Sequence, residues 1–120
     1  MKVQLTVTGA AELEMLAVTT KEFEVPRFKK YLSDIVGSHR KLRGALERVG
    51  LRRNEDGWKG LKRLLGKTIE IDFSREEVLV LIILVEFAIS RHIDAEYRSL
   101  PDILRKMNAR AREVGLLIEK

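Results

Sequence analysis

The chain has 120 residues, of which 45% are hydrophobic and 34% charged, a balance typical of one globular domain spanning residues 1–120. It contains no cysteine, which excludes disulfides, thiolate catalysis and Cys-type zinc sites. The longest apolar run, residues 78–85, is far shorter than the roughly 20 residues that cross a bilayer. We therefore expect a cytoplasmic protein without a membrane partner.

The net charge of +5 is concentrated in the middle of the chain. The segment 21–67 carries 14 basic and six acidic residues, whereas the segments on either side of it are slightly acidic overall. Clustered Lys and Arg attract acidic partners, so this middle segment is the first candidate for a binding surface.

The first part of the chain predicts a strand followed by a short helix. Apolar and polar residues alternate over residues 2–8, which is the pattern of a strand with one solvated face. Thr8 is placed to cap a helix over about residues 9–17. Residues 18–25 are ambiguous between an edge strand and a loop.

Two further helices and a polar loop are predicted next. Pro26 suits the first turn of a helix, and Gly37 suits its end, after which a second helix runs to Gly50. Residues 52–57 are polar and predict a loop, and residues 58–66 predict a short helix.

A strand and a well-capped helix organise the second half. Residues 68–73 alternate as a half-buried strand does. Ser74 and Glu77 then form a capping-box pattern, so a helix is expected over 75–92. Ser99 caps the last helix. The sequence thus predicts a helix-dominated α+β domain with a small sheet and about five helices.

The two halves echo one another, and a β-α-α internal repeat is one interpretation. The matching residues, at a constant separation of 66, are Val3, Leu5, Val7, Thr8, Leu13 and Leu16 with Ile69, Ile71, Phe73, Ser74, Leu79 and Ile82. The alternative, which we favour from sequence, is that any strand followed by a capped helix produces this pattern.

Residues 78–85 are apolar on every side of the predicted helix, and such a helix must be covered on every side. A small sheet and a few helices give limited cover, so we predict a homo-oligomer with this helix at the interface. The residues expected at that interface are Leu79, Ile82, Ile83 and Phe87. The alternative is that the helix forms the middle of a monomeric core.

The basic segment 39–67 is the strongest candidate for a functional surface, with DNA or RNA as the partner, because phosphates attract clustered cations. The predicted nucleic-acid-binding residues are His39, Arg40, Lys41, Arg43, Arg48, Arg52, Arg53, Lys59, Lys62 and Arg63. Trp58 or Tyr31 could stack on a base. A helix-turn-helix with Gly37 in the turn is disfavoured, because Arg43 would occupy an apolar position. The alternative is a solvated basic face with Trp58 in the core.

Two motif-like stretches carry little weight. Gly60 and Gly66 nearly match a phosphate-binding loop, but five residues separate them instead of four, and a helix leads into a strand rather than the reverse. His92, Asp94 and Glu96 have ligand chemistry, yet without a second ligand cluster a polar helix end explains them better.

Glu86 is the remaining candidate for chemistry. Burial would raise its pKa and suit it to acid–base work, but pairing with Arg110 or Arg112, or exposure to solvent, is the simpler interpretation. The chain shows no nucleophile elbow and no matched pair of carboxylates. We therefore expect no enzyme, no metal and no cofactor.

Two stretches resemble a known family. The sequence VTGAAELEMLA at residues 7–17 and NEDGWKGLK at 54–62 are similar to the opening and the Asp-Gly…Trp segment of the phage virion-morphogenesis (tail-completion) family. The similarity covers about half the chain, and the Gly-Arg-Leu segment and following strands of that family are absent. The resemblance implies a virion or assembly role.

The leading hypothesis is a small, non-enzymatic binding protein that presents residues 39–67 to DNA or RNA. The alternative is a homo-oligomeric protein–protein interaction or assembly component, for example a phage structural or accessory protein, whose basic surface is incidental.

Overall fold

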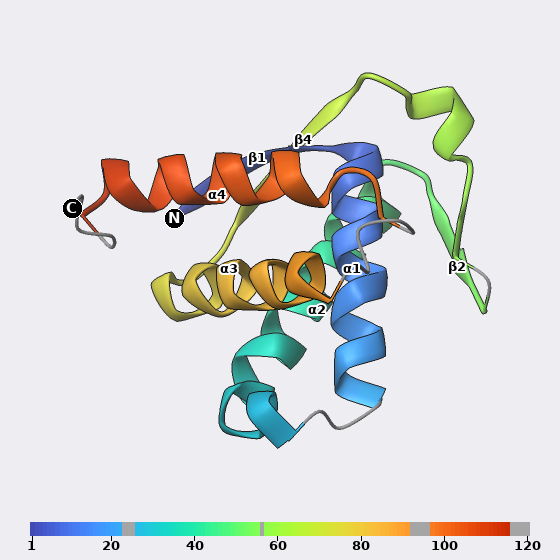
Figure 1. Ribbon diagram of the computed structural model, residues 1–120. Coiled ribbons are helices and arrows are strands. Elements are labelled where there is room, and N and C mark those ends of the chain that lie inside the picture. Colours follow the sequence, from blue (N-terminus) through green and yellow to red (C-terminus); the bar gives the residue numbers. More distant parts are fainter. Residues whose placement is uncertain (23–25, 56, 92–96, 116–120) are drawn as a thin grey trace.

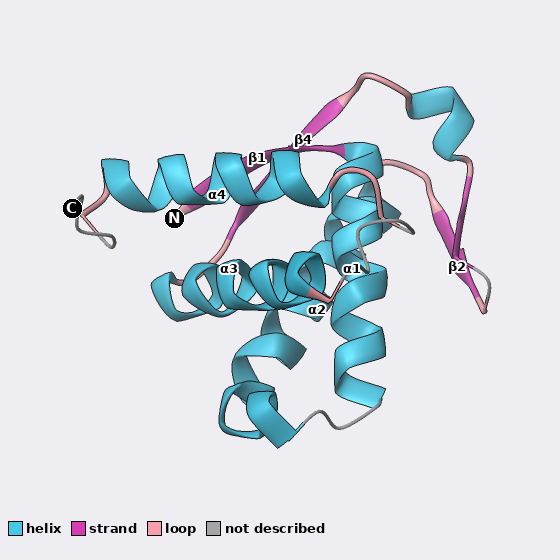
Figure 2. Ribbon diagram, viewed as in Figure 1, coloured by secondary structure: helices cyan, strands magenta, loops and turns pink. Residues whose placement is uncertain are grey.

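The computed structural model describes residues 1–22, 26–55, 57–91 and 97–115. The elements in chain order are β1 (Lys2–Thr6), α1 (Val7–Glu22), the 3-10 helix η1 (Pro26–Tyr31), α2 (Leu32–Arg48), β2 (Arg52–Asn54), β3 (Gly57–Lys59), the 3-10 helix η2 (Leu61–Leu64), β4 (Thr68–Asp72), α3 (Arg75–Ser90) and α4 (Leu100–Glu113). Helices outweigh the two small antiparallel sheets, as Figure 2 shows, so the predicted helix-dominated α+β class is confirmed. The described residues form four α-helices and two 3-10 helices, slightly different from the five expected.

Strands β1 and β4 pair antiparallel, with Gln4 opposite Glu70 at the centre of the ladder. Helix α4 packs against β1 and α2 against β4, and α3 lies between α2 and α4 (Figure 1). Apolar strand residues such as Leu5 and Ile71 are buried under these helices. Apolar and polar residues therefore alternate along β1 and β4 because helices cover only one face of each strand.

The first helix begins two residues earlier than predicted. Strand β1 ends at Thr6, and the Thr6 hydroxyl accepts a hydrogen bond from the Gly9 amide at 3.0 Å. Thr6 rather than Thr8 therefore supplies the cap. The amide of Val7 donates to the carbonyl of Lys67 at 2.9 Å, so the chain turns from strand into helix without a loop.

Helix α2 runs without a break through Gly37, and the predicted stop at this glycine is wrong. The buried stripe of Ile35, Leu42 and Leu46 continues past it at helical spacing, and this packing overrides the weak helix propensity of one glycine. Because no turn exists at Gly37, the described chain forms no helix-turn-helix there.

The predicted polar loop at 52–57 is instead part of a hairpin of β2 and β3. The predicted helix over 58–66 is reduced to the single 3-10 turn η2, because Trp58 belongs to β3. Gly57 and Gly60 have φ of 138° and 98°, a backbone conformation that side chains disfavour, and they bound the short strand β3.

The capping box before α3 is confirmed. The Glu77 amide donates to the Ser74 hydroxyl at 3.1 Å, and the Ser74 amide donates to the Glu77 carboxylate at 2.7 Å. At α4 the expected Ser99 side-chain cap is absent, and the Ser99 amide donates instead to the carboxylate of Glu12 in α1 at 2.9 Å.

The order strand, helix, helix occurs twice around the β1–β4 ladder. Helices α1 and α3 have 16 residues each and begin at Val7 and Arg75, a separation of 68. Most of their buried positions coincide at this separation, so that Leu13 corresponds to Leu81, although buried Val7 corresponds to exposed Arg75. The constant separation of 66 expected from the sequence, which pairs Leu13 with Leu79, is therefore wrong in the helices. It holds only in the strands.

The two-residue difference has a local cause. Residues 73–74 separate β4 from α3, whereas α1 follows β1 directly. The exchanged packing, in which the second helix of each half covers the strand of the other half, is what a two-fold axis through the ladder would produce. The hairpin of β2 and β3 lies outside this repeated pattern.

Candidate nucleic-acid interface

A buried carboxylate, Glu14 of α1, is the centre of the polar contacts that hold the hairpin. Its side chain is 0% exposed. Arg53 Nε and Trp58 Nε1 donate to its Oε1 at 2.6 Å and 2.8 Å, and His39 Nε2 lies 2.9 Å from its Oε2. Arg53 and Trp58 belong to β2 and β3, and His39 to α2, so one carboxylate ties three elements to α1.

Glu14 is held in its charged form. Burial by itself raises the pKa, but the hydrogen bonds from His39, Arg53 and Trp58 outweigh it, and the pKa lies below its ordinary value. The equivalent position in the other half, Ile82 of α3, is apolar and buried. The first half therefore has a carboxylate where the second half has an apolar side chain. Glu14 accepts hydrogen bonds from Arg53 and Trp58 of the hairpin, and the described residues of the second half form no such hairpin.

The hairpin has two chemically different faces. Arg53 and Trp58 are opposite each other across the strands, and both turn inward to Glu14. Arg52 and Lys59, the neighbouring pair, are opposite each other on the exposed face. This outer face therefore has a local excess of positive charge. Because like charges directly opposite in a strand pair destabilise it, Arg52 and Lys59 repel each other.

Four of the ten predicted nucleic-acid-binding residues contact the protein's own carboxylates. His39 and Arg53 contact Glu14, and Lys41 Nζ lies 2.5 Å from Glu77. Arg43 pairs with Glu47 one helical turn away at 2.9 Å. The other six are exposed and make no ion pair with any described residue: Arg40, Arg48, Arg52, Lys59, Lys62 and Arg63.

The two aromatic residues proposed for base stacking are not free platforms. Trp58 is 8% exposed and its indole N–H is bound to Glu14, so it lies in the core, as the alternative interpretation expected. Tyr31 is half-buried at the end of η1, beside Lys30, whose Nζ lies 4.9 Å from the ring centroid.

Of these cations, Arg52, Lys59, Lys62 and Arg63 lie together on the hairpin and η2, and we call this segment the basic arm. The hairpin and η2 pack against α1 and α2, and Figure 1 shows them on the side of α1 opposite α3. From residue 57 to residue 67 the sequence contains no acidic residue. The hairpin also contains Glu55 and Asp56, but none of the four cations of the arm forms an ion pair with a described residue.

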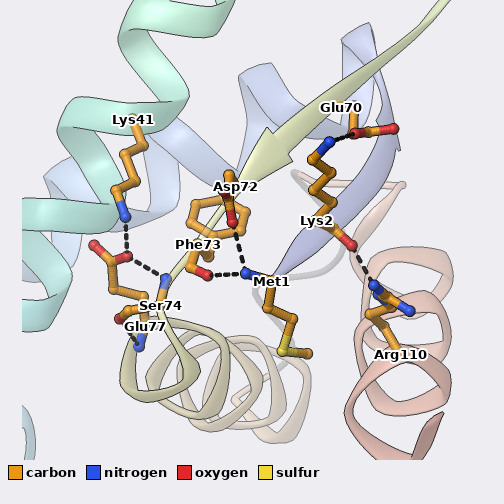
Figure 3. Close-up of polar contacts among 9 residues, drawn as sticks. All are labelled: Met1, Lys2, Lys41, Glu70, Asp72, Phe73, Ser74, Glu77 and Arg110. Carbon is orange, nitrogen blue, oxygen red and sulfur yellow. Dashed lines mark hydrogen bonds and ion pairs between the residues drawn. The ribbon is translucent and has the colours of Figure 1, made fainter. Parts of the chain in front are cut away.

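Lys41 forms an ion pair with a second buried carboxylate, that of Glu77. Figure 3 shows its ammonium reaching Glu77, the capping-box residue of α3, beside Ser74. A Cβ on Gly37 would lie 2.6 Å from the other Glu77 oxygen, so a side chain at residue 37 would require this carboxylate to shift. Burial raises the pKa of Glu77, but Lys41 and Ser74 outweigh it and hold the pKa below its ordinary value.

The residues predicted for an oligomer interface are distributed unevenly over α3. Ile82 is 5% exposed and packs within the subunit, whereas Leu79, Ile83 and Phe87 are half-buried. Ile83 and Phe87 line a surface hollow of about 570 Å³ that we call the α3 hollow. Its lining residues are Lys30, Tyr31, Ile83, Glu86, Phe87 and Ser90.

The weaker candidates for chemistry gain little from the structure. Glu86 is exposed, and Arg110 bonds the Lys2 carbonyl and Glu113 instead of Glu86 (Figure 3 shows the contact with Lys2). Among the residues that the structure describes, no cluster of three or more acidic or histidine side chains could hold a metal ion. His92, Asp94 and Glu96, which the sequence favoured as a polar helix end rather than a metal site, lie outside the described residues.

The two buried carboxylates predict how stability depends on pH. Both pKa values are lower in the folded protein than the ordinary 4.5. Their contribution to the free energy of unfolding is therefore complete above about pH 4.5 and is lost as the pH falls through the folded values. We expect urea midpoints to fall steeply below pH 4.5. The double variant Glu14→Gln, Glu77→Gln should be less stable at pH 7, with a flatter acid limb; an unchanged limb would contradict this.

Glu14 was not identified from the sequence, although its position in the helix gives a signal. Glu14 lies four residues after Ala10 and three before Ala17, so it shares the helix face of buried apolar residues in α1. A charge in such a stripe needs a partner. Two of the three partners, Arg53 and Trp58, lie in the hairpin, which the sequence did not predict.

Comparison with known proteins adds no relative: no protein-family model, curated protein or solved structure matches this chain. In the part of the chain that the structure describes, none of the helices has the length and apolar character needed to traverse a bilayer.

Proposed function

We propose that this protein is a non-enzymatic nucleic-acid-binding protein of the cytoplasm, and that the basic arm contacts the phosphate backbone of DNA or RNA. The observation that carries the proposal is the pair Arg52 and Lys59, directly opposite on the exposed face of the hairpin with no carboxylate partner among the described residues. A phosphate between them would relieve their repulsion.

The Glu14 contacts support the same proposal because they fix the arm's orientation. Arg53 and Trp58 alternate with Arg52 and Lys59 along the two strands, so anchoring the inner pair turns the outer pair to solvent. Lys62 and Arg63 follow within four residues and extend the charged surface. Two-stranded ribbons of this kind can lie against a nucleic-acid groove or backbone.

Binding should be strongly salt-dependent. Four phosphate contacts predict an affinity that falls about 100-fold between 50 and 200 mM salt. Fluorescence anisotropy of labelled single-stranded DNA, duplex DNA and single-stranded RNA, titrated at both salt concentrations, measures this directly. The variant Arg52→Glu, Lys59→Glu should bind at least about tenfold more weakly, with a smaller salt slope.

A matched control separates the arm from general electrostatic attraction. Arg98 and Arg112 are exposed, and replacing both by Glu changes the net charge by the same amount. This control should retain most of the affinity. Absence of binding at 50 mM salt, or an equal loss in both double variants, would contradict the proposal.

A second candidate function is that of an assembly component, such as a phage accessory protein, acting through protein–protein contacts. The observation that favours it is the half-buried apolar surface of Ile83 and Phe87 at the α3 hollow. This surface is separate from the basic arm in sequence and structure, so the two functions are compatible.

A further inference from the structure

We propose that a second copy of this chain docks on the α3 hollow across a two-fold axis, so that Lys30 of each copy faces Glu86 of the other. This inference rests on the second candidate function and gives it a surface and a partner. It does not depend on nucleic-acid binding by the basic arm.

In the part of the chain that the structure describes, the hairpin covers a place on α1 whose equivalent on α3 has no such cover. At the separation of 68, Met15 of α1 corresponds to Ile83 of α3. On α1 the hairpin comes close to Met15, whose Sδ would lie 3.5 Å from a Cβ on Gly57. Among the described residues no hairpin stands at the equivalent place on α3.

The hollow is bordered by charges of both signs. Lys30 and Glu86 both line it, and neither forms an ion pair with a described residue. A surface that carries an apolar centre with one cation and one anion is complementary to itself when turned about a two-fold axis. A second copy therefore satisfies both charges and covers Ile83.

The half-buried Tyr31 and Ile83 line the hollow and give it an apolar centre of the kind found in homodimers. Leu32, which follows Tyr31 directly in the chain, is 45% exposed and adds apolar surface at the start of α2. Among the described leucines, Leu65 is also strongly exposed, at 67%, and it lies beyond η2, where it provides a control site.

Charge reversal tests the arrangement without disturbing the core. Size exclusion with light scattering and sedimentation, from about 1 to about 500 μM, should show a dimer for the natural chain. Lys30→Glu and Glu86→Lys should each weaken dimerisation about tenfold or more, because each substitution alters two symmetry-related contacts. The double variant Lys30→Glu, Glu86→Lys should restore it to within about threefold.

The controls make each outcome decisive. Leu65→Asp should leave the dimer intact, whereas Ile83→Asp should abolish it with unchanged circular dichroism. A monomer at every concentration, a double variant as weak as the single ones, or dissociation by Leu65→Asp would overturn the proposal. The double charge swap keeps the net charge, so its nucleic-acid affinity shows independently whether the basic arm functions.

Discussion

Replacing Glu14 by Gln should lower the free energy of unfolding by about 3 kcal/mol, the largest effect we expect from an isosteric change in this protein. The carboxylate is fully buried and contacts Arg53, Trp58 and His39. The amide of Gln cannot accept hydrogen bonds from all three. It also leaves the guanidinium of Arg53, whose side chain is 16% exposed, without its counter-charge. Unfolding in guanidinium chloride, followed by the fluorescence of Trp58, the only tryptophan, measures this loss of stability.

Two further measurements test the cause. Glu76→Gln, an exposed carboxylate at the start of α3, should change stability by less than about 0.5 kcal/mol. Limited trypsin digestion of Glu14→Gln should cut faster after Lys59, Lys62 or Arg63, because the hairpin loses its anchor before the core opens. A loss below about 1 kcal/mol, or unchanged cleavage, would show that the three contacts do not hold the hairpin.

Gly37→Ala should lower the free energy of unfolding by about 1–2 kcal/mol, although Ala normally favours a helix over Gly by about 1 kcal/mol. The new Cβ would stand 2.6 Å from Glu77, whose carboxylate is held by Lys41 and by its own capping box. The carboxylate must move and weaken one of these contacts. Chemical denaturation measures the sign directly.

The same substitution elsewhere, and in a second background, should have the opposite effect. Gly44 lies on the same helix with only the Arg48 guanidinium within 3.7 Å, so Gly44→Ala should stabilise by about 0.5–1 kcal/mol. In a Glu77→Ala background, Gly37→Ala should also stabilise. If Gly37→Ala stabilises the natural chain, the close approach of α2 and α3 does not require a glycine.

Local patterns predicted the parts of the fold whose causes are local. Alternation placed β1 and β4 to within two residues, and Ser74 with Glu77 placed the start of α3 correctly. Each of these signals depends on residues a few positions apart. The stop predicted at Gly37 was wrong because the buried residues of α2 continue past it, and its nearest contact outside α2 is Glu77 of α3, 40 residues away in the chain.

The hairpin could not be predicted from its own residues. Its strands are three residues long and carry Arg, Asn and Lys, so no apolar alternation marks them. They form because Arg53 and Trp58 find a common acceptor in Glu14. Of the proposed binding residues, the sequence therefore identified the exposed pair Arg52 and Lys59 together with others that the fold turns inward.

By itself the sequence determined the α+β class, the two main strands, the capped helix α3 and the basic character of the middle segment, because periodicity, capping and composition act over short distances. Only the tertiary structure decided which cations face solvent, since an ion pair such as Arg53 with Glu14 joins residues far apart in the chain. Burial made the difference, because an enclosed carboxylate takes its donors from whichever elements the fold brings within reach.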